Sequence, residues 1–256
     1  MRIALGVEYD GTNFSGWQFQ AHAPSVQGVV EVALSKVANH PVKVICAGRT
    51  DAGVHALGQV IHADVNVQRS MRSWVLGTNT NLPKDVSILW AQAVDNNFHA
   101  RFSAQARHYR YEILNRPTRL ALFAKHKTWE RRPLNVEQMQ IAGHYLVGTH
   151  DFSSYRAVTC QAKNPIRTIS RLKISRLDEQ VRIEISANAF LQHMVRNIVG
   201  VLVAIGYGKK KPQWAQTVLE ARDRRAGGVT APPFGLYFCE VDYPEPYLFP
   251  KGYQIK

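Results

Sequence analysis

The order of short periodic segments most constrains the fold of this chain, because the same order occurs twice. In the first half, an alternating strand-like segment is followed by a helix-like spacing, two more strands, a short helix and a final strand. The second half repeats this order and adds one helix. Strand, helix, strand, strand, helix, strand is the pattern of a split βαβ, ferredoxin-like unit. The sequence therefore predicts a duplicated α+β fold.

Both halves have identifiable elements, joined by a segment rich in proline and basic residues at 115–135. Ser25 is a suitable N-cap for the first helix. A hairpin is expected around residues 178–180. The predicted strands are 2–10, 42–47, 58–65, 86–94, 108–114, 168–177, 181–187 and 235–243. The predicted helices are 25–40, 71–76, 136–148, 191–206 and 212–222.

Sheets of this type are antiparallel and carry their helices on one face. We therefore predict an α+β fold of two pseudo-duplicated ferredoxin-like (RRM-like) halves. Their sheets are expected to join side by side, with helices on the outer face and a basic cleft between the halves. The predicted domains are residues 1–105 and 106–256.

The charge of the chain points to a polyanionic partner. The formal net charge is +13 and the pI is about 9.9. In a soluble protein, such an excess most often serves nucleic-acid binding, although a basic surface without a partner is the alternative. No apolar run reaches the length of a membrane span, and the N-terminus lacks the features of a signal peptide, so a cytoplasmic location is expected.

The cysteines argue against a disulfide framework and against a zinc site. Cys46, Cys160 and Cys239 are odd in number, far apart and outside any C-x-x-C motif. Buried, inert thiols are the simpler interpretation, and no metal is expected.

The stretch AGRTDAGVHA at 47–56 is the first candidate site. Asp51 lies among small residues, with Arg49 two positions before it and His55 four after. Small residues let backbone approach a ligand closely, and loops between strands often carry function. A simple turn would also explain an aspartate beside a glycine.

A polar stripe in an apolar helix is the second candidate. In LQHMVRNIVGVLVAIG, His193, Arg196, Asn197 and Gly200 share one face at helical spacing. An arginine in so apolar a helix is expected to be paired, because an unpaired buried charge is costly. Asp51 is the predicted partner, since an arginine holds a neighbouring carboxylate ionised and orients it. A purely structural ion pair, or a stripe that faces solvent, remains open.

A third candidate is the strand RFSAQARHYRYEIL, in which arginines alternate with aromatic residues. Such a face can stack bases and hold phosphates, although an aromatic strand face can equally belong to the core. In this segment, Arg101, Arg107 and Arg110 interleave with Phe102, Tyr109 and Tyr111.

Together these features indicate an enzyme that acts on RNA or DNA with a single carboxylate. The sequence lacks a P-loop and the G-x-G-x-x-G spacing. A single-carboxylate site without a cofactor suits a reaction at a glycosidic carbon or on a base. Two other classes stay open: an RNA-binding protein or chaperone without activity, and a hydrolase that cuts the glycosidic bond and releases the base.

The sequence closely resembles the bacterial tRNA pseudouridine synthase A family, which isomerises uridines in the anticodon arm. The resemblance runs nearly end to end. It is carried by EYDGTNFSGWQFQ, SVQGVVEVAL, GRTDAGVHALGQV, LPKDVSI, FHARFSAQARHYRYEI, GTHDFSSYRA, NPIRTI, FLQHMVRNIVG and TAPPFGLYFCEVDYP. GRTDAGVHA and FLQHMVRNIVG are the most distinctive of these.

The resemblance implies roles for individual residues. Asp51 matches the catalytic aspartate, Tyr109 the residue that stacks on the target base and could act as its general base, and Arg196 the partner of the aspartate. Arg49 is expected to enter the stem or hold a phosphate. His55 and the arginines named above are expected to contact the RNA. The first domain would then carry the catalytic loop, and the second the tyrosine and the partner arginine.

The resemblance also implies the substrate and the assembly. Uridines 38, 39 and 40 of the tRNA anticodon stem-loop would be converted to pseudouridine without any cofactor. The protein would act as a homodimer. Small departures, such as Phe19 after GWQ and Phe234 in APPFGL, concern fine contacts.

Overall fold

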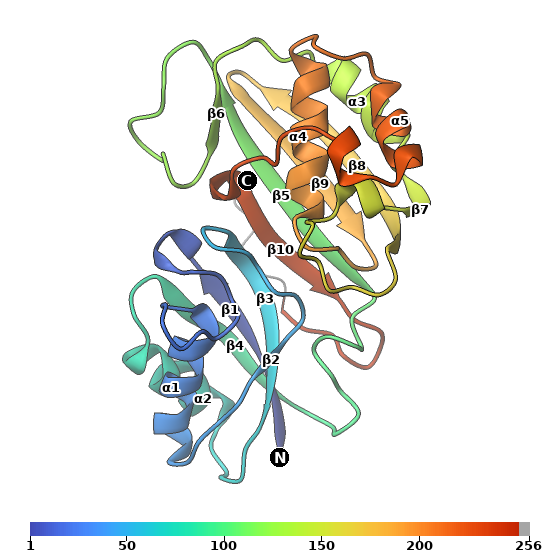
Figure 1. The fold of residues 1–256 in the computed structure, drawn as a ribbon. Helices are drawn as coiled ribbons and strands as arrows, with labels where there is room; N and C mark the ends of the chain where they lie inside the picture. Colours follow the sequence, from blue (N-terminus) through green and yellow to red (C-terminus); the bar gives the residue numbers. More distant parts are fainter. Residues whose placement is uncertain (251–256) are drawn as a thin grey trace. The chain divides into compact units, whose positions relative to one another are not determined.

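The computed structural model describes residues 1–250, and the chain divides into two compact units (Figure 1). Unit 1 contains Met1–Arg107 and the segment from Tyr237 onward, and unit 2 contains His108–Leu236. The predicted domain bounds, residues 1–105 and 106–256, stay a prediction. Along the described residues, no helix is both long and apolar enough to cross a bilayer.

Unit 1 has the antiparallel strand order β4-β1-β3, with β2 antiparallel on the far edge of β3. This is the arrangement predicted for the first half. Helices α1 and α2 pack against each other, and α2 packs on β4 (Figure 1). The elements are β1 (Arg2–Tyr9), α1 (Val26–Ala38), β2 (Ile45–Cys46), β3 (His55–Asp64), α2 (Met71–Asn81) and β4 (Val86–Val94).

The last strand departs from the prediction of purely antiparallel sheets. Strand β10 (Leu236–Asp242) runs parallel to β3, with Tyr237 opposite His55 and Phe238 opposite Ala56. It uses the start of β3, whereas β2 pairs with Ile61 and His62 further along. The fold is therefore mixed α+β with both strand directions.

Unit 2 has the strand order β5-β9-β8-β7, with β8 antiparallel to both β7 and β9. Strand β6 lies parallel to β5, inside the segment 115–135 that was predicted as a linker, so residues 128–130 of that segment belong to a sheet instead. The strands are β5 (Ala106–Asn115), β6 (Thr128–Glu130), β7 (Gly148–Asp151), β8 (Ile166–Leu177) and β9 (Gln180–Ala187). The helices are α3 (Val136–His144), α4 (Met194–Gly206) and α5 (Trp214–Ala221).

Local chemistry explains where two of the helices begin. The Ser25 hydroxyl accepts a hydrogen bond from the Gly28 amide at 3.3 Å, which confirms the predicted cap of α1. Helix α4 begins at Met194 and not at the predicted residue 191, because His193 has a left-handed backbone conformation with φ of 61°.

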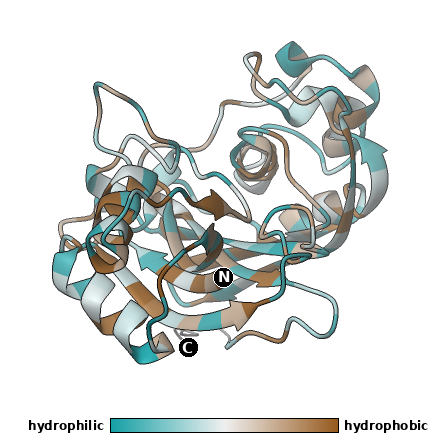
Figure 2. Cartoon of the chain, turned by 90° about the horizontal axis from the view of Figure 1, so that it is seen from below, coloured by the Kyte–Doolittle hydropathy of each residue, from teal (hydrophilic) through white to brown (hydrophobic). Residues whose placement is uncertain are grey.

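Apolar residues concentrate in the strands and in the helix faces that cover them (Figure 2). Complete burial of one such side chain stabilises the fold by roughly 1.5–3 kcal/mol. The largest fully buried side chains of unit 1 include Ile3, Leu5, Trp17, Leu34, Ile61, Trp74 and Ile88. Those of unit 2 include Tyr111, Phe152 and Tyr155. All three cysteines are free, but only Cys46 is buried, so the prediction of buried thiols is wrong for Cys160 and Cys239.

Candidate active site

Asp51 lies half-buried in the loop that joins β2 to β3 in unit 1. The loop turns sharply here, since the Val54 amide donates to the Asp51 carbonyl at 3.2 Å and Gly53 has a φ of 74°. That positive φ suits glycine and would strain most other residues. The small residues around Asp51 thus shape a tight turn that presents the carboxylate.

The segment that follows β1 holds one side of this loop. The Tyr9 hydroxyl lies 2.7 Å from the Thr50 hydroxyl, and the Trp17 amide donates to the Thr50 carbonyl at 3.0 Å. The backbone at Gly11 lies so close to the backbone at Val54 that a Cβ on Gly11 would be 2.0 Å from the Val54 carbonyl oxygen. The residue before Asp51 is therefore fixed through both its side chain and its backbone.

Strand β3 holds the base of the loop. The buried Gln59 side chain donates to the Gly48 carbonyl at 2.6 Å and accepts from the Gly48 amide at 3.3 Å. The Ala47 amide donates to the Val60 carbonyl at 2.8 Å. Because both ends of the loop are hydrogen-bonded, Asp51 is held by a rigid scaffold, as an active-site group requires.

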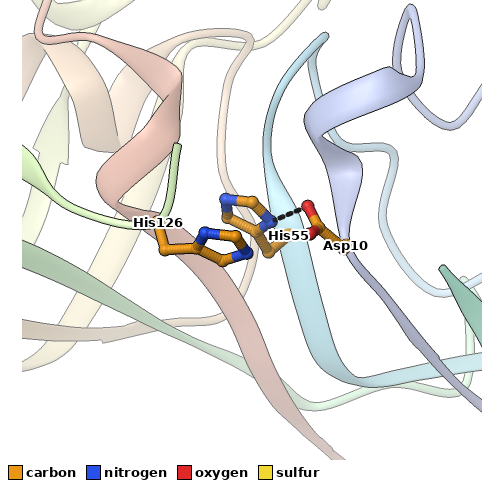
Figure 3. Close-up of side chains that lie close together, drawn as sticks. All are labelled: Asp10, His55 and His126. Atoms are coloured by element: carbon orange, nitrogen blue, oxygen red, sulfur yellow. Dashed lines mark ion pairs between the residues drawn. The ribbon is translucent and has the colours of Figure 1, made fainter. Parts of the chain in front are cut away.

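His55 is buried behind the loop, at 2% exposure. Its Nδ1 lies 3.0 Å from an Asp10 carboxylate oxygen (Figure 3) and 3.1 Å from the Gly11 amide. A proton on Nδ1 would pair with the carboxylate, whereas a bare Nδ1 accepts from the amide. The imidazole stacks on the Tyr237 ring with 4.8 Å between centroids. His55 thus ties the start of β3 to β10 and to the segment after β1.

Arg49 and Arg101 are the exposed arginines of this region. Both guanidinium groups act electrostatically on the buried Cys46 thiol in the direction that lowers its pKa. Burial is the larger cause and raises the pKa of Cys46 to about 12, so the thiol stays protonated and inert at neutral pH. Both positive charges therefore lie in the neighbourhood of the Cys46 thiol, which directly precedes the Asp51 loop.

Arg107 is buried, and its guanidinium hydrogen-bonds to the backbone. It donates to the Ala47 carbonyl at 3.2 Å, to the Ala104 carbonyl at 3.0 Å and to the Arg101 carbonyl. It therefore joins the segment between β4 and β5 to the start of the Asp51 loop. Charge-assisted bonds of this kind are stronger than neutral ones, which favours a positioning role.

Strand β3 carries His62, a buried histidine that contacts the segment between β4 and β5. Its Nδ1 accepts a hydrogen bond from the Ala100 amide at 3.1 Å, so the folded state favours a neutral ring. Burial, then the charges of Arg2 and His99, lower the pKa of His62 to about 4.

We expect the free energy of unfolding to fall as the pH drops from about 6.5 toward 4, by up to about 1.4 kcal/mol per pH unit. The unfolded chain binds a proton in this window that the folded His62 rejects, so the contribution is complete above pH 6.5 and is lost below it. Urea titrations across this range should show a shallower slope for His62→Asn than for the wild type. Parallel curves would contradict the prediction. The pKa of His99 is also lowered by burial, so part of the slope should remain.

In unit 2, the structure distinguishes the two tyrosines of the YRY sequence. Tyr111 is fully buried, and its hydroxyl contacts the Thr128 hydroxyl at 2.6 Å and donates to the Pro232 carbonyl at 2.8 Å. Tyr109 is half-buried, and its ring packs edge-on against Phe190 with 4.9 Å between centroids. Tyr111 therefore belongs to the core, whereas Tyr109 keeps exposed surface.

Arg110 pairs with a buried carboxylate. Its Nε lies 2.8 Å from Glu112, whose side chain is only 4% exposed. Glu112 also accepts from Arg182 at 2.9 Å and from the Gln180 side chain. Arg110 thus belongs to a compact polar network on β5 and β9.

The polar stripe of α4 contacts the segment before β10. The Arg196 Nε donates to the Ala231 carbonyl at 2.8 Å, and the buried Asn197 accepts from the Thr230 hydroxyl at 2.7 Å. A Cβ on Gly200 would lie 1.8 Å from the Val229 carbonyl oxygen, so only glycine allows this approach. Arg196, Asn197 and Gly200 thus lie against residues 229–231, so the stripe does not face only solvent.

The structure gathers the predicted residues in two sets. Asp51, Arg49, His55, Arg101 and Arg107 belong to unit 1. Tyr109, Arg110 and Arg196 belong to unit 2. The ion pair between Asp51 and Arg196 stays a prediction. Sequence reasoning gave no role to four residues that support the Asp51 loop and its neighbour His55, namely Tyr9, Asp10, Gly11 and Trp17. All four lie in the motif EYDGTNFSGWQFQ, which could have indicated them.

The comparisons with known proteins agree on one family. A family model described as tRNA pseudouridine synthase matches residues 6–103 and 142–244. Proteins named tRNA pseudouridine synthase A are 57% identical over 250 residues in Coxiella burnetii, 56% over 253 in Pseudomonas aeruginosa and 58% over 251 in Nitrosococcus oceani. Each alignment covers 98% of this chain, and 96%, 89% and 97% of the respective relative.

The likeness to solved structures is weak. A chain from a structure of an H/ACA RNP bound to a substrate RNA containing 2′-deoxyuridine has a TM-score of 0.36 and 8% identity, covering 78% of this chain and 44% of that one. The sequence comparisons, in contrast, confirm the predicted family and its isomerase class. By both the family model and these relatives, the chain belongs to the tRNA pseudouridine synthase family.

Proposed function

We propose that this protein converts uridine to pseudouridine at positions 38, 39 and 40 of the tRNA anticodon stem-loop, and that Asp51 is its central catalytic residue. The observation that carries the proposal is the half-buried Asp51 in a loop hydrogen-bonded at both ends. In this reaction the uracil changes its attachment to C1′ of the same ribose from N1 to C5. A single carboxylate placed at C1′ suits such a reaction.

The reaction is an isomerisation, so its atoms balance without a co-reactant. The bond from N1 of uracil to C1′ breaks, the base turns, and a bond from C5 to C1′ forms. The C5 proton leaves for water, and N1 takes up a proton from water, so the product is an isomer of the substrate. Asp51 either attacks C1′ to form a covalent intermediate or removes a ribose proton to form a glycal. A covalent path would divide one difficult step into two easier ones.

Arg196 and Tyr109 would complete the site. We propose that the Arg196 guanidinium, whose Nε is fixed on the Ala231 carbonyl, pairs with Asp51 and keeps it ionised. Tyr109 would stack on the detached uracil and accept the C5 proton. Its partial exposure supports this role over Tyr111, whose hydroxyl is already hydrogen-bonded in the core.

The residues predicted to contact RNA fall into two groups, those that are exposed and those that are held by other protein groups. The exposed Arg49 and Arg101 would bind phosphates or enter the stem, so affinity should fall as salt rises. His55, Arg107 and Arg110, predicted from the sequence as RNA contacts, are held by protein groups, and we propose that they position the loop and strand instead. The proposed assembly is a homodimer, and the proposed location is the cytoplasm, where tRNA is processed.

We expect Tyr109→Phe to bind tRNA within about twofold of wild type but to turn over about 10²-fold more slowly, because it keeps the ring and loses the proton acceptor. Tyr109→Ala should lose affinity as well. Filter binding and single-turnover kinetics measure the two effects separately. Tyr145→Phe, another half-buried tyrosine of unit 2, is the matched control. Wild-type turnover by Tyr109→Phe would exclude the hydroxyl as general base.

The test of the proposed function is to map the modified positions. Unmodified tRNA is incubated with the protein, treated with a carbodiimide that marks pseudouridine, and copied by reverse transcriptase. Stops one nucleotide 3′ of positions 38 to 40, and none next to other uridines, are expected. Stops elsewhere in the tRNA would contradict the proposed specificity.

A further inference from the structure

Phe102 is a large aromatic side chain that the fold leaves in solvent. It is 75% exposed, although residues of this size are usually mostly buried. It lies in the segment between β4 and β5 of unit 1 (Figure 1). An exposed ring on a segment closed by its own hydrogen bonds suggests a surface kept for contact with a ligand.

The segment around Phe102 is closed by its own hydrogen bonds. The His99 Nδ1 accepts from the amides of Arg101 at 3.2 Å and Phe102 at 3.1 Å. The Ser103 hydroxyl accepts from the His99 amide at 3.0 Å, and the Ser103 amide donates to the His99 carbonyl at 2.9 Å. The backbone that carries Phe102 is therefore fixed without burying the ring.

Two neighbours set the chemistry of this surface. The His99 ring stacks on the Phe102 ring, with 4.3 Å between centroids and 27° between planes. Burial lowers the pKa of His99, which favours a neutral ring beneath the phenyl group. The Arg101 guanidinium lies 5.4 Å from the Phe102 ring centroid, in range of a cation–π contact. An aromatic ring beside a guanidinium is the usual makeup of a surface that stacks nucleobases.

Arg107 fixes this platform (His99, Arg101 and Phe102) next to the Asp51 loop. Its guanidinium bonds the carbonyls of Arg101 and Ala104 on one side and of Ala47 on the other. Ala47 is four residues before Asp51 in the chain. Arg49 and Arg101 both act electrostatically on the Cys46 thiol, so each charge lies in the neighbourhood of Cys46, at the start of the loop. The platform and the catalytic loop are thus parts of one rigid body.

We infer that Phe102, flanked by Arg101, stacks on an unpaired nucleobase of the bound tRNA close to the target uridine. The inference rests on the proposed function for the identity of the ligand. Stacking there would offset part of the cost of unpairing and unstacking the target region, which is a few kcal/mol. Because every base has a π face, the contact would serve several tRNAs with different sequences.

The experiment compares Phe102→Ala and Phe102→Trp with wild type in filter binding to unmodified tRNA. Loss of one stacking contact should weaken binding by about 5- to 100-fold for Phe102→Ala, while Phe102→Trp stays within about twofold. The salt dependence of the Ala variant should equal that of wild type, since no charge is removed. Leu177→Ala, equally exposed at 75% on β8, is the matched control and should bind like wild type.

Three results would overturn the inference. Phe102→Ala could bind tRNA like wild type, or Phe102→Trp could bind as weakly as Phe102→Ala. Alternatively, Phe102→Ala could change the sedimentation mass of the free protein, which would assign the ring to a contact between copies of this chain. All these readouts are independent of turnover. A wild-type protein that binds tRNA but makes no pseudouridine would therefore defeat the proposed function while leaving the stacking test intact.

Discussion

Replacing Asp51 with asparagine is expected to reduce pseudouridine formation at least about 10³-fold while leaving tRNA affinity within a few-fold of wild type. Asparagine has the same shape but neither attacks C1′ nor accepts a ribose proton, so both chemical routes lose their central group. The loop should keep its conformation, because its hydrogen bonds involve Thr50, Gly48 and the backbone of Val54. Single-turnover assays with enzyme in excess, beside filter binding, measure the two quantities.

Asp85→Asn is the matched control for this variant. Asp85 is also a half-buried aspartate of unit 1, and its carboxylate makes one long contact to Asn13 at 3.4 Å. It should react at the wild-type rate. If Asp51→Asn retained turnover within tenfold of wild type, Asp51 would be a structural turn residue, the alternative that the sequence left open.

Glu112→Ala is expected to lower the free energy of unfolding by about 3–5 kcal/mol. The carboxylate is 4% exposed, and it neutralises Arg110 at 2.8 Å and Arg182 at 2.9 Å. Its removal leaves two nearby cations, of which Arg110 is only 12% exposed, without this counter-charge. A loss of this size is a large part of the 5–15 kcal/mol typical of folded proteins, so the effect should be evident in urea denaturation.

Glu179→Ala provides the comparison. Glu179 is 56% exposed and meets Arg116 at 3.4 Å, so its ion pair is largely solvated. Exposed pairs contribute at most about 1 kcal/mol, and the variant should unfold nearly like wild type. Equal losses for the two variants would show that the buried network around Glu112 adds nothing beyond an ordinary surface pair.

Much of the fold could be predicted because strands and helices repeat with different periods. The alternation in RIALGVEYD and VSILWAQAV placed β1 and β4 within a residue or so. Strands β6 and β7, three and four residues long, are too short to show any period. Helix α2 extends to Asn81, beyond the predicted residue 76. The apolar pattern did not reveal its second half, because the residue buried there is Thr78 and not an apolar one.

The parallel pairing of β10 with β3 could not be predicted from local pattern. Alternation identifies a strand but not its neighbour, and the two strands are about 180 residues apart, as the register of Tyr237 with His55 shows. Sheets of this type of fold are usually antiparallel, so an antiparallel partner was expected for this strand.

Sequence reasoning could select residue types for the site but could not show which of these side chains are buried. Asp51 was singled out by the small residues around it, the arginine in the later apolar helix and the motif GRTDAGVHA, and its catalytic role stays a prediction. Arg107 was assigned to RNA because arginines near aromatics suit nucleic acids, yet backbone carbonyls from two loops surround its guanidinium. The support for Asp51 from Tyr9 and Trp17 joins residues more than 30 positions apart, which no local pattern reveals.

The central claim is that the chain isomerises uridine without releasing the base. It is tested most directly with tRNA that carries [5-³H]uridine, by measuring in one reaction the tritium released to water and the free uracil. The account predicts that wild-type protein releases tritium in step with pseudouridine formation and liberates no uracil. Release of free uracil would identify a hydrolase, and tight binding of tRNA without tritium release would identify a protein that binds this RNA without catalysis.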